Sequence, residues 1–373
     1  MNMIAKLMLL ILTLLLAMVL IVGCQSFETT NEDLPRLISR DSNLYNNGEL
    51  YIDNQQRLNF FDFTSMKSTI VCPKPNCPHN GQSDCSSLGM TTCPLIYGNH
   101  IYFFDNEIQY GNDGKPIWIT ALYKANIDGT NRIKINSFEN YQLMYYDRLI
   151  LCGGMLYFAP LIVGYEENGI SSNLLGAKLC SYSFAENKVN ELYDLGKGYG
   201  FNTYLWGESN GDIYVEVSYR EDEISFDELM DLLMNTDENI YTHVNYKYDI
   251  ENNSLSESDP NYKPMLGGYL CHFEDNGVTL YLPSGELFVD DMTNDMYDIY
   301  DIMAAGDYIF DVDDMLAINI NTGEKYSLLI DDGADFIYYV DGYYILKKLN
   351  RDSGIYEYEQ VSETELIGIN HVE

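Results

Sequence analysis

The chain has 373 residues, and its 57 Asp and Glu residues against 21 Lys and Arg residues give a formal net charge of −36 at pH 7. The acidic residues are spread along the chain. Because nucleic-acid binding needs a basic face and an anionic membrane repels an acidic surface, both are excluded as partners of the folded part. Solubility accounts for the charge, and capture of Ca²⁺ or of a cationic partner is the functional alternative.

Residues 1–23 predict the signal peptide of a bacterial lipoprotein. Lys6 is their only charged residue, and the apolar run after it has 16 residues, short of the about 20 that a spanning helix needs. The run ends in Ile21-Val22-Gly23-Cys24, which resembles a lipobox, so we expect cleavage before Cys24 and attachment of a diacylglycerol to its thiol. The alternative is a plain N-terminal membrane anchor with an incidental cysteine. Both interpretations place residues 25–373 outside the cytoplasm, at the outer face of the cell membrane.

Residues 24–42 are mostly polar and lack hydrophobic periodicity. They are expected to form a flexible tether that begins at the lipidated Cys24. The folded domain is expected to occupy residues 43–373, which is enough chain for one large β domain.

One short motif repeats through this domain. Each copy has a turn glycine followed by an apolar and aromatic strand. A segment with period-2 alternation, a turn and a further strand comes next, as in LYKANIDGTNRIKI and LAININTGEKYSL. The turn glycines lie 29 to 66 residues apart, at Gly48, Gly98, Gly154, Gly211, Gly277, Gly306 and Gly342.

Four antiparallel strands repeated about every 50 residues are typical of a β-propeller blade. The repeat therefore predicts an all-β fold, a β-propeller of about seven blades, and the short fifth unit leaves six or eight blades open. Face-to-face packing of blades would bury both faces of each sheet and explain the 33 Tyr and 15 Phe. A β-sandwich with irregular hairpins is the alternative, which explains the strands but not the repeat.

The stretch SFDELMDLLMNTDEN, residues 225–239, predicts one short helical insertion in the fourth unit. Ser225 and Glu228 fit a capping box, and Phe226, Leu229 and Leu233 share one helical face. The helix would lie at a rim of the propeller.

The stretch CPKPNCPHNGQSDC, from Cys72 to Cys85, predicts a metal site. Three thiolates and one imidazole suit tetrahedral Zn²⁺ or Fe²⁺. We expect Cys72, Cys77, His79 and Cys85 to hold a structural zinc or iron ion, with Cys93 as an alternative ligand. In a propeller this loop would link the outer strand of the first blade to the inner strand of the second.

Disulfide bonds are the rival interpretation, because exported proteins favour them. Cys72, Cys77, Cys85 and Cys93 could form two bridges and leave His79 as a bystander. Seven cysteines follow Cys24, so at least one has no partner within the chain, and free thiols are a third interpretation. The remaining three cysteines lie in apolar strands and are expected in the core: Cys152, Cys180 and Cys271.

Other chemical motifs are missing from the sequence. It contains no G-x-S-x-G elbow, P-loop or G-x-G-x-x-G turn. The other histidines are isolated along the chain: His100, His243, His272 and His371. Some acidic residues could ligate calcium but lack the spacing of a calcium-binding loop: Asp290, Asp291, Asp311, Asp313 and Asp314.

The lipobox, the repeated glycine-turn strands and the C-x4-C-x-H-x5-C cluster resemble a group of secreted β-propeller-like lipoproteins of Gram-positive anaerobes. The resemblance implies a propeller fold and an extracytoplasmic location, but no established activity. We expect a non-enzymatic module that binds an extracellular protein, peptide or glycan at its central face. The alternatives are a propeller enzyme acting on extracellular glycans or peptides, and a structural scaffold in an envelope complex.

Overall fold

The structure is a computed structural model with two units, Met1–Glu32 and Asp33–Glu373. It describes residues 36–371 with gaps at 39–43, 46, 54, 56, 75–76, 80–84, 86–93, 113, 115, 144–147, 166–171, 224–239, 265–268, 275–276, 283–286, 290–301, 313–314, 331–333 and 351–354. Cys24, Cys93 and the predicted helix at 225–239 lie outside the described residues. The same holds for four of the acidic residues considered for calcium: Asp290, Asp291, Asp313 and Asp314.

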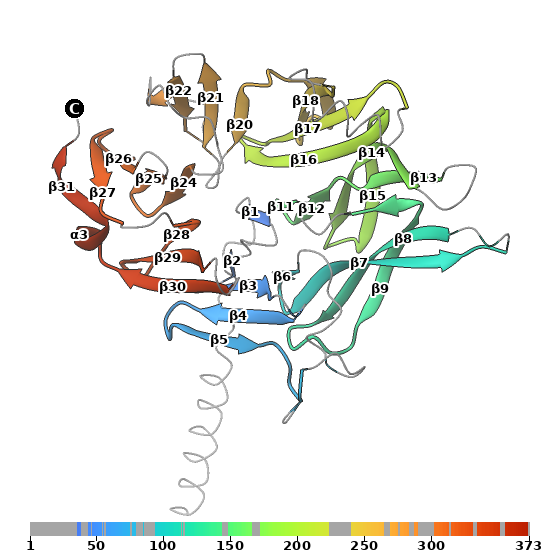
Figure 1. Ribbon diagram of the computed structural model, residues 1–373, viewed down its shortest axis with the longest axis horizontal. Coiled ribbons are helices and arrows are strands. Elements are labelled where there is room, and N and C mark those ends of the chain that lie inside the picture. The colour runs from blue at the N-terminus through green and yellow to red at the C-terminus, as the bar shows by residue number, and fades with distance from the viewer. Residues whose placement is uncertain are drawn as a thin grey trace, which may run out of the picture. The chain divides into compact units, whose positions relative to one another are not determined.

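Seven antiparallel sheets follow one another along the described chain, which confirms the predicted seven-bladed β-propeller (Figure 1). Blade 1 consists of β2 (Leu44–Tyr45), β3 (Gly48–Ile52), β4 (Leu58–Asp62) and β5 (Lys67–Ile70). Blade 2 consists of β6 (Leu95–Tyr97), β7 (His100–Tyr110), β8 (Pro116–Asn126) and β9 (Ile133–Glu139). Blade 3 consists of β11 (Leu149–Cys152), β12 (Met155–Phe158), β14 (Ser172–Ser183) and β15 (Lys188–Lys197), with β1 (Arg36–Ile38), β10 (Tyr141–Gln142) and β13 (Leu161–Tyr165) added.

The other four blades are built in the same way. Blade 4 consists of β16 (Tyr199–Ser209), β17 (Asp212–Arg220), β18 (Thr242–Asp249) and β19 (Ser254–Glu257). Blade 5 consists of β20 (Tyr262–Pro264), β21 (Leu270–Glu274), β22 (Gly277–Tyr281) and β23 (Leu287–Val289). Blade 6 consists of β24 (Ile302–Ala305), β25 (Tyr308–Asp311), β26 (Leu316–Asn319), β27 (Lys325–Leu328) and β31 (Ile367–His371). Blade 7 consists of β28 (Phe336–Val340), β29 (Tyr343–Asn350) and β30 (Ile355–Val361).

The repeated glycine marks the turn between the first and second strands of every blade except blade 5. At Gly306 the need for glycine is twofold, because φ is +59° and a Cβ atom would lie 2.8 Å from the Tyr344 hydroxyl. In blade 5 the prediction was wrong by one strand, since Gly277 joins the second strand, β21, to the third, β22. A glycine turn suits any hairpin, so the motif alone does not say which hairpin it closes.

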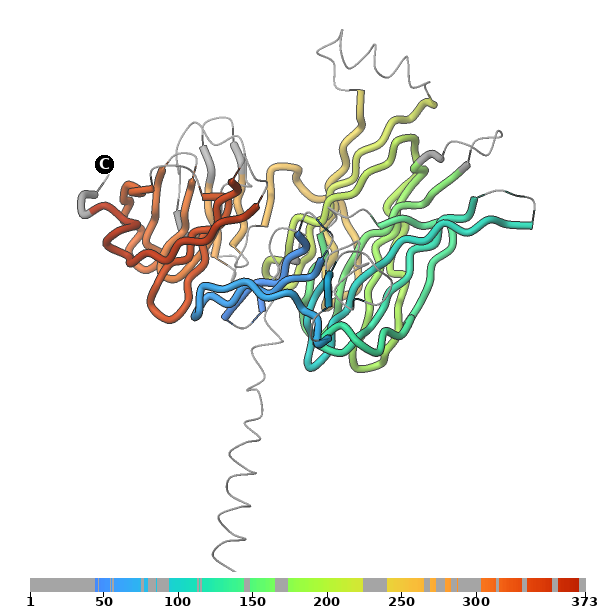
Figure 2. The backbone as a smooth tube through the Cα atoms, turned by 60° about the horizontal axis from the view of Figure 1, so that its bottom comes forward, coloured from blue at the N-terminus to red at the C-terminus, as the bar shows by residue number. Residues whose placement is uncertain are grey.

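Apolar clusters between neighbouring blades form the core. One joins blades 2 and 3 through Phe104 and Phe158, whose ring centroids lie 4.8 Å apart. Another joins blades 3 and 4 through Leu179 and Val215, and a third joins blades 6 and 7. The longest strands belong to blades 2, 3 and 4, which Figure 2 shows side by side in cyan to yellow-green. Burial of both sheet faces explains why the strands are rich in aromatic residues.

Two strands lie where the sequence analysis did not expect them. Arg36–Ile38, within the predicted tether, form β1 and pair with β11 of blade 3, so the folded chain starts before residue 43. By the repeat, the last unit should end in a further strand of its own blade, but β31 pairs with β27 of blade 6. Both strands are short and pair with distant parts of the chain, and period-2 alternation does not identify such partners.

The helix α3 (Glu363–Leu366) carries the chain from blade 7 to β31. The backbone N–H of Ser362 donates a 2.8 Å hydrogen bond to the Glu365 carboxylate, which is one half of a capping box. Leu366 is fully buried in the cluster between blades 6 and 7. The capping signal of Ser362 and Glu365 explains why a helix forms here.

Leu366→Ala is expected to lower the free energy of unfolding by about 2–5 kcal/mol, because it leaves a cavity under α3. Urea unfolding measures the change. Thr364→Ala, at an exposed position of the same helix, serves as the control and should shift the value by about 0.5 kcal/mol or less. Equal effects of the two substitutions would show that α3 does not anchor β31.

Candidate metal centre

The cysteine cluster lies in the connection from β5, the last strand of blade 1, to β6, the first strand of blade 2. This is the place that the sequence predicted. Two backbone hydrogen bonds fix the start of the loop, from Val71 N–H to the Leu58 carbonyl at 2.9 Å and from Cys72 N–H to the Ile70 carbonyl at 2.9 Å. The Cys77 N–H reaches back to the Lys74 carbonyl at 3.3 Å and closes a turn. The turn brings the first two cysteines together.

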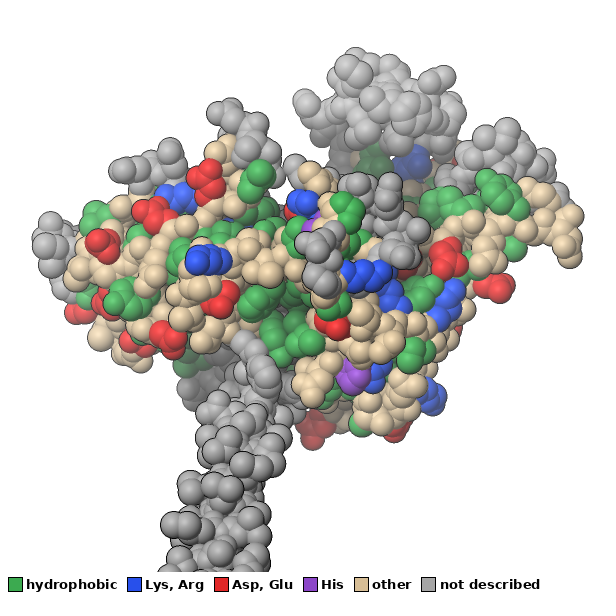
Figure 3. Space-filling model, turned by 90° about the horizontal axis from the view of Figure 1, so that it is seen from below, with side chains coloured by type: hydrophobic (Ala, Val, Ile, Leu, Met, Phe, Trp, Pro, Cys, Tyr) green, Lys and Arg blue, Asp and Glu red, His purple; other side chains and the backbone are tan. Residues whose placement is uncertain are grey.

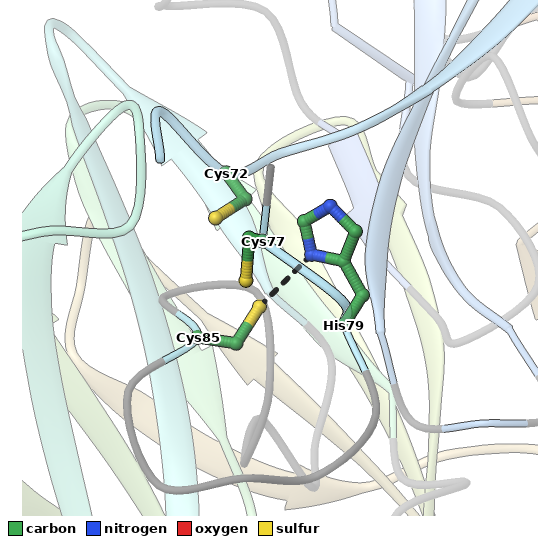
Figure 4. Close-up of side chains that lie close together, drawn as sticks. All are labelled: Cys72, Cys77, His79 and Cys85. Carbon is green, nitrogen blue, oxygen red and sulfur yellow. Dashed lines mark hydrogen bonds between the residues drawn. The ribbon is translucent and has the colours of Figure 1, made fainter. Parts of the chain in front are cut away.

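Cys72, Cys77, His79 and Cys85 converge on one point (Figure 4). Their four potential ligand atoms all lie within 4.8 Å of one another. The inward nitrogen of the imidazole is Nδ1, which lies 3.1 Å from the Cys85 Sγ atom. His79 has a φ of +49°, a conformation uncommon outside glycine and asparagine. All four side chains are partly buried.

The donor set fits a closed tetrahedral metal site. With metal–sulfur bonds of about 2.3 Å, the ligand atoms of a tetrahedron lie roughly 3.8 Å apart. The observed upper limit of 4.8 Å therefore needs only a small contraction of the loop. Three sulfurs and one nitrogen fill four positions, which is typical of structural sites, whereas catalytic sites keep one position open. This cluster could bind a metal ion and would leave it no open position.

The Cys77 thiol has a raised pKa in the absence of a cation. The His79 N–H donates a hydrogen bond that lowers the pKa of Cys77, but burial and the nearby thiols of Cys85 and Cys72 raise it by more, so the net shift is upward. A divalent cation reverses this preference, because metal binding requires the thiolate form. Metal affinity of this site should therefore fall as the pH is lowered.

Arg132, in the turn between β8 and β9, is close enough to Cys85 to sense its charge. Burial lowers the pKa of the Arg132 guanidinium, and the charges of Asp105 and Cys85 offset part of this. Residues 57–134 hold seven Lys and Arg against six Asp and Glu, in contrast to the rest of the chain. In Figure 3 the lysine and arginine side chains likewise gather on the half of the view that contains blade 2. Three thiolates and a divalent ion carry a net charge of −1, which the nearby Arg132 guanidinium would stabilise.

The six cysteines that the structure describes form no disulfide with one another. Cys93, the fourth cysteine of the disulfide interpretation, lies outside the described residues. Cys180 and Cys271 are buried, as predicted, and Cys152 is partly buried. Burial raises the pKa of Cys152 to about 11 and that of Cys180 to about 12. These three are core residues of their blades.

Within the described part of the chain, the cysteine cluster is the one group of three or more potential metal ligands that lie together. Asp311 is buried on β25 and belongs to no such group. His100 begins β7, as expected of a strand residue. His272 stacks on Tyr262 with ring centroids 4.2 Å apart.

A second group of polar side chains, which no sequence motif predicted, lies on the side of blade 4 that faces blade 5. His243, isolated in the sequence, places its Nδ1 atom 3.0 Å from the Glu216 carboxylate. The same carboxylate accepts hydrogen bonds from the Lys263 ammonium at 2.8 Å and from the Trp206 indole at 3.0 Å. The alternation in DIYVEVSYR, residues 212–220, could have indicated this group, because it predicts a strand with one apolar face and one polar face.

No family model matches the chain, and no curated protein sequence matches it. Solved structures do match. An oligogalacturonate lyase in complex with manganese has a TM-score of 0.45 and 6% identity, with 88% of this chain and 90% of that chain covered. An apocarotenoid oxygenase mutant from Synechocystis has a TM-score of 0.36 and 8% identity, with 76% and 66% covered. A gluconolactonase from Xanthomonas campestris has a TM-score of 0.28 and 12% identity, with 68% and 78% covered. Similarity at this level carries no argument about activity, substrate or metal.

Proposed function

We propose that the protein is a lipid-anchored, extracytoplasmic β-propeller that binds a ligand without chemical turnover. The observation that carries this proposal is the side of blade 4 toward blade 5. The described apolar clusters join blades 1 and 2, 2 and 3, 3 and 4, 6 and 7, and 7 and 1. On the side of blade 4 toward blade 5, by contrast, Glu216, Asn245 and the 43% exposed His243 share a face. A polar face with aromatic neighbours on rigid strands suits recognition.

Two carboxylates support binding over catalysis. Glu49 is completely buried beside Lys347 and has no access to a substrate. Although burial raises the pKa of Glu216, its bonds to Lys263, His243 and Trp206 lower it by more, so the net shift is downward. A carboxylate that stays ionised holds its neighbours in place and is a poor general acid near neutral pH.

The alternative is an enzyme acting on extracellular glycans or peptides, and the contact between His243 and Glu216 is what supports it. A histidine oriented by a carboxylate is a common general base. Glu216→Gln would abolish turnover in an enzyme, whereas in a binding module it should change ligand affinity alone.

The binding proposal is tested by placing a photo-cross-linking amino acid at position 243 of the full chain in intact cells. The same residue at position 188, an exposed lysine at the start of β15, is the control. We expect adducts from position 243 and none from position 188. Adducts from neither position, or equal adducts from both, would argue against a binding face on blade 4.

The lipid anchor rests on Ile21-Val22-Gly23-Cys24 and the apolar run before it. Among the described residues, no helix is long and apolar enough to cross a membrane. Cys24→Ala should abolish incorporation of a labelled fatty acid, since the acyl chains attach to this thiol. Cys152→Ala is the matched control and should keep the label. An unlabelled wild-type protein that stays with the membrane would favour the plain N-terminal anchor.

We further propose that the cysteine cluster binds zinc or iron as a structural ion that cross-links the loop. The support is the complete set of four ligands in the connection between blades 1 and 2. The described residues of this loop, between Ile70 and Leu95, form no helix or strand, and a metal that joins its parts would order it. Cys72, Cys77, His79 and Cys85 would hold the ion, which would supply cross-linking and no chemistry.

A further inference from the structure

The two faces of blade 4 differ in chemistry. On one face Leu205, Val215 and Val217 belong to the apolar cluster shared with blade 3. On the other, cross-strand pairs place Glu216 opposite Asn245, and Ser218 opposite both His243 and Asn202. Residues directly opposite in antiparallel strands share a face. This second face forms a polar ladder across β16, β17 and β18.

The first rung of the ladder is fixed by blade 5. Lys263, on β20, binds Glu216 at 2.8 Å and Asn245 at 3.1 Å, and its ammonium lies 4.1 Å from the centre of the Trp206 ring. Because the Glu216 carboxylate only accepts hydrogen bonds, the Nδ1 atom of His243 carries the proton that faces it. The Nε2 atom of His243 is then the nitrogen available to a ligand.

The last rung holds an arginine that lacks acceptors. The Nε and Nη1 atoms of Arg220 are buried and have no hydrogen-bond partner among the described residues. The guanidinium lies 6.0 Å from the centre of the Tyr241 ring. Gly200 also lies close to it, since a Cβ atom there would come within 3.3 Å of the Arg220 Nη2 atom. Gly200 and Tyr241 therefore both lie near the guanidinium, whose buried Nε and Nη1 nitrogens require an acceptor.

We propose that this face of blade 4 binds an acidic saccharide, with its carboxylate or sulfate group on Arg220. Planar guanidinium groups bind such oxyanions through paired hydrogen bonds. The neutral side chains of the exposed Asn202 and the partly buried Ser218 suit sugar hydroxyls, and Tyr241 offers a ring face. The proposal rests on the binding function and names its ligand class.

Binding of an acidic group at this face would depend on direct contact with the Arg220 guanidinium and not on long-range attraction, because the exposed Glu221, Asp222 and Glu223 follow it in the chain. The chain has a net charge of −36, so most of its surface repels a polyanion. Arg148, whose guanidinium lies 4.4 Å from the centre of the Tyr204 ring, supplies a second cation beside Trp206.

The experiment measures binding of the full chain to hyaluronan, which carries carboxylates, to dextran sulfate, and to neutral dextran. We expect binding to at least one acidic polymer and none to dextran. Arg220→Gln should weaken it about ten- to a hundredfold, because a charge-assisted contact is lost. Lys188→Gln, an exposed substitution on blade 3, should leave it unchanged.

Tyr241→Ala provides a second test of the same site if Arg220→Gln reduces folding, and should also weaken binding. Equal binding by the wild type and both variants would overturn the site. Binding to neither acidic polymer, or equal binding to dextran, would overturn the ligand class. These failures are distinct from failure of the binding function, because position 243 would still form adducts in intact cells if another ligand occupied the face.

Discussion

Lys347→Met is expected to destabilise the protein by about 3–5 kcal/mol, the cost of leaving a buried charge without its partner. The Lys347 ammonium on β29 binds the Glu49 carboxylate on β3 at 2.6 Å, and both side chains are completely buried. The Tyr358 hydroxyl donates a second bond to Glu49 at 2.8 Å. Since blades 1 and 7 share no strand, this pair and the apolar cluster around Phe61 and Ile345 join the two ends of the propeller.

The destabilisation should depend on pH. Burial raises the pKa of Glu49, and Lys347, Tyr358 and Tyr338 offset only part of this rise. Without Lys347 the pKa of Glu49 rises further. A group with a raised pKa in the folded state favours folding at low pH, and this contribution is lost as the pH increases through that pKa. The decrease in the free energy of unfolding caused by Lys347→Met should therefore be larger at pH 7 than at pH 4.

Two further variants isolate the pair. Glu49→Gln combined with Lys347→Met should recover much of the lost stability, because no uncompensated charge remains. Lys348→Met is the matched control on the same strand, since Lys348 pairs with the largely exposed Glu359 at 3.2 Å. Exposed pairs contribute about 1 kcal/mol or less. If urea unfolding gave the same loss of stability for Lys347→Met and Lys348→Met, the buried ion pair would not be what joins blades 1 and 7.

Removal of the metal from the cysteine cluster is expected to have the second large effect. A bound ion stabilises the folded state by about 4 kcal/mol when its free concentration is a thousand times its dissociation constant. Cys77→Ser should abolish stoichiometric metal binding and remove this contribution, because one of four ligands is lost. A strong chelator should lower the melting temperature of the wild type and leave that of Cys77→Ser unchanged.

Cys152→Ser is the control for this prediction. Cys152 is a partly buried cysteine of blade 3 outside the cluster, so its substitution should keep both the metal and the response to the chelator. If the chelator acted equally on the wild type and on Cys77→Ser, the cluster would not be a metal site.

The repeat made the fold predictable because the same local sequence pattern recurs from blade to blade. A glycine at positive φ, such as Gly98 or Gly211, and an alternating strand after it are visible without long-range information. The exceptions need contacts that no local pattern contains. β1 pairs with β11, more than a hundred residues away, and β31 joins blade 6 across the whole of blade 7.

The candidate metal site was predictable for the same reason, since its ligands lie within fourteen residues from Cys72 to Cys85. The polar face of blade 4 was not. Glu216, His243 and Lys263 are spread over 48 residues, and strand pairing and blade packing bring them together. Arg132 was missed likewise, because its proximity to Cys85 depends on how blade 2 packs beside the loop.

Elemental analysis of protein purified without oxygen, combined with a count of reactive thiols, tests the structural metal ion most directly. We expect one zinc or iron ion per chain. The thiols of Cys72, Cys77 and Cys85 should then react only after the metal has been removed. A chain without metal, in which the cluster thiols are missing from the count until a reductant is added, would contradict the account and establish disulfide bonds in place of the metal.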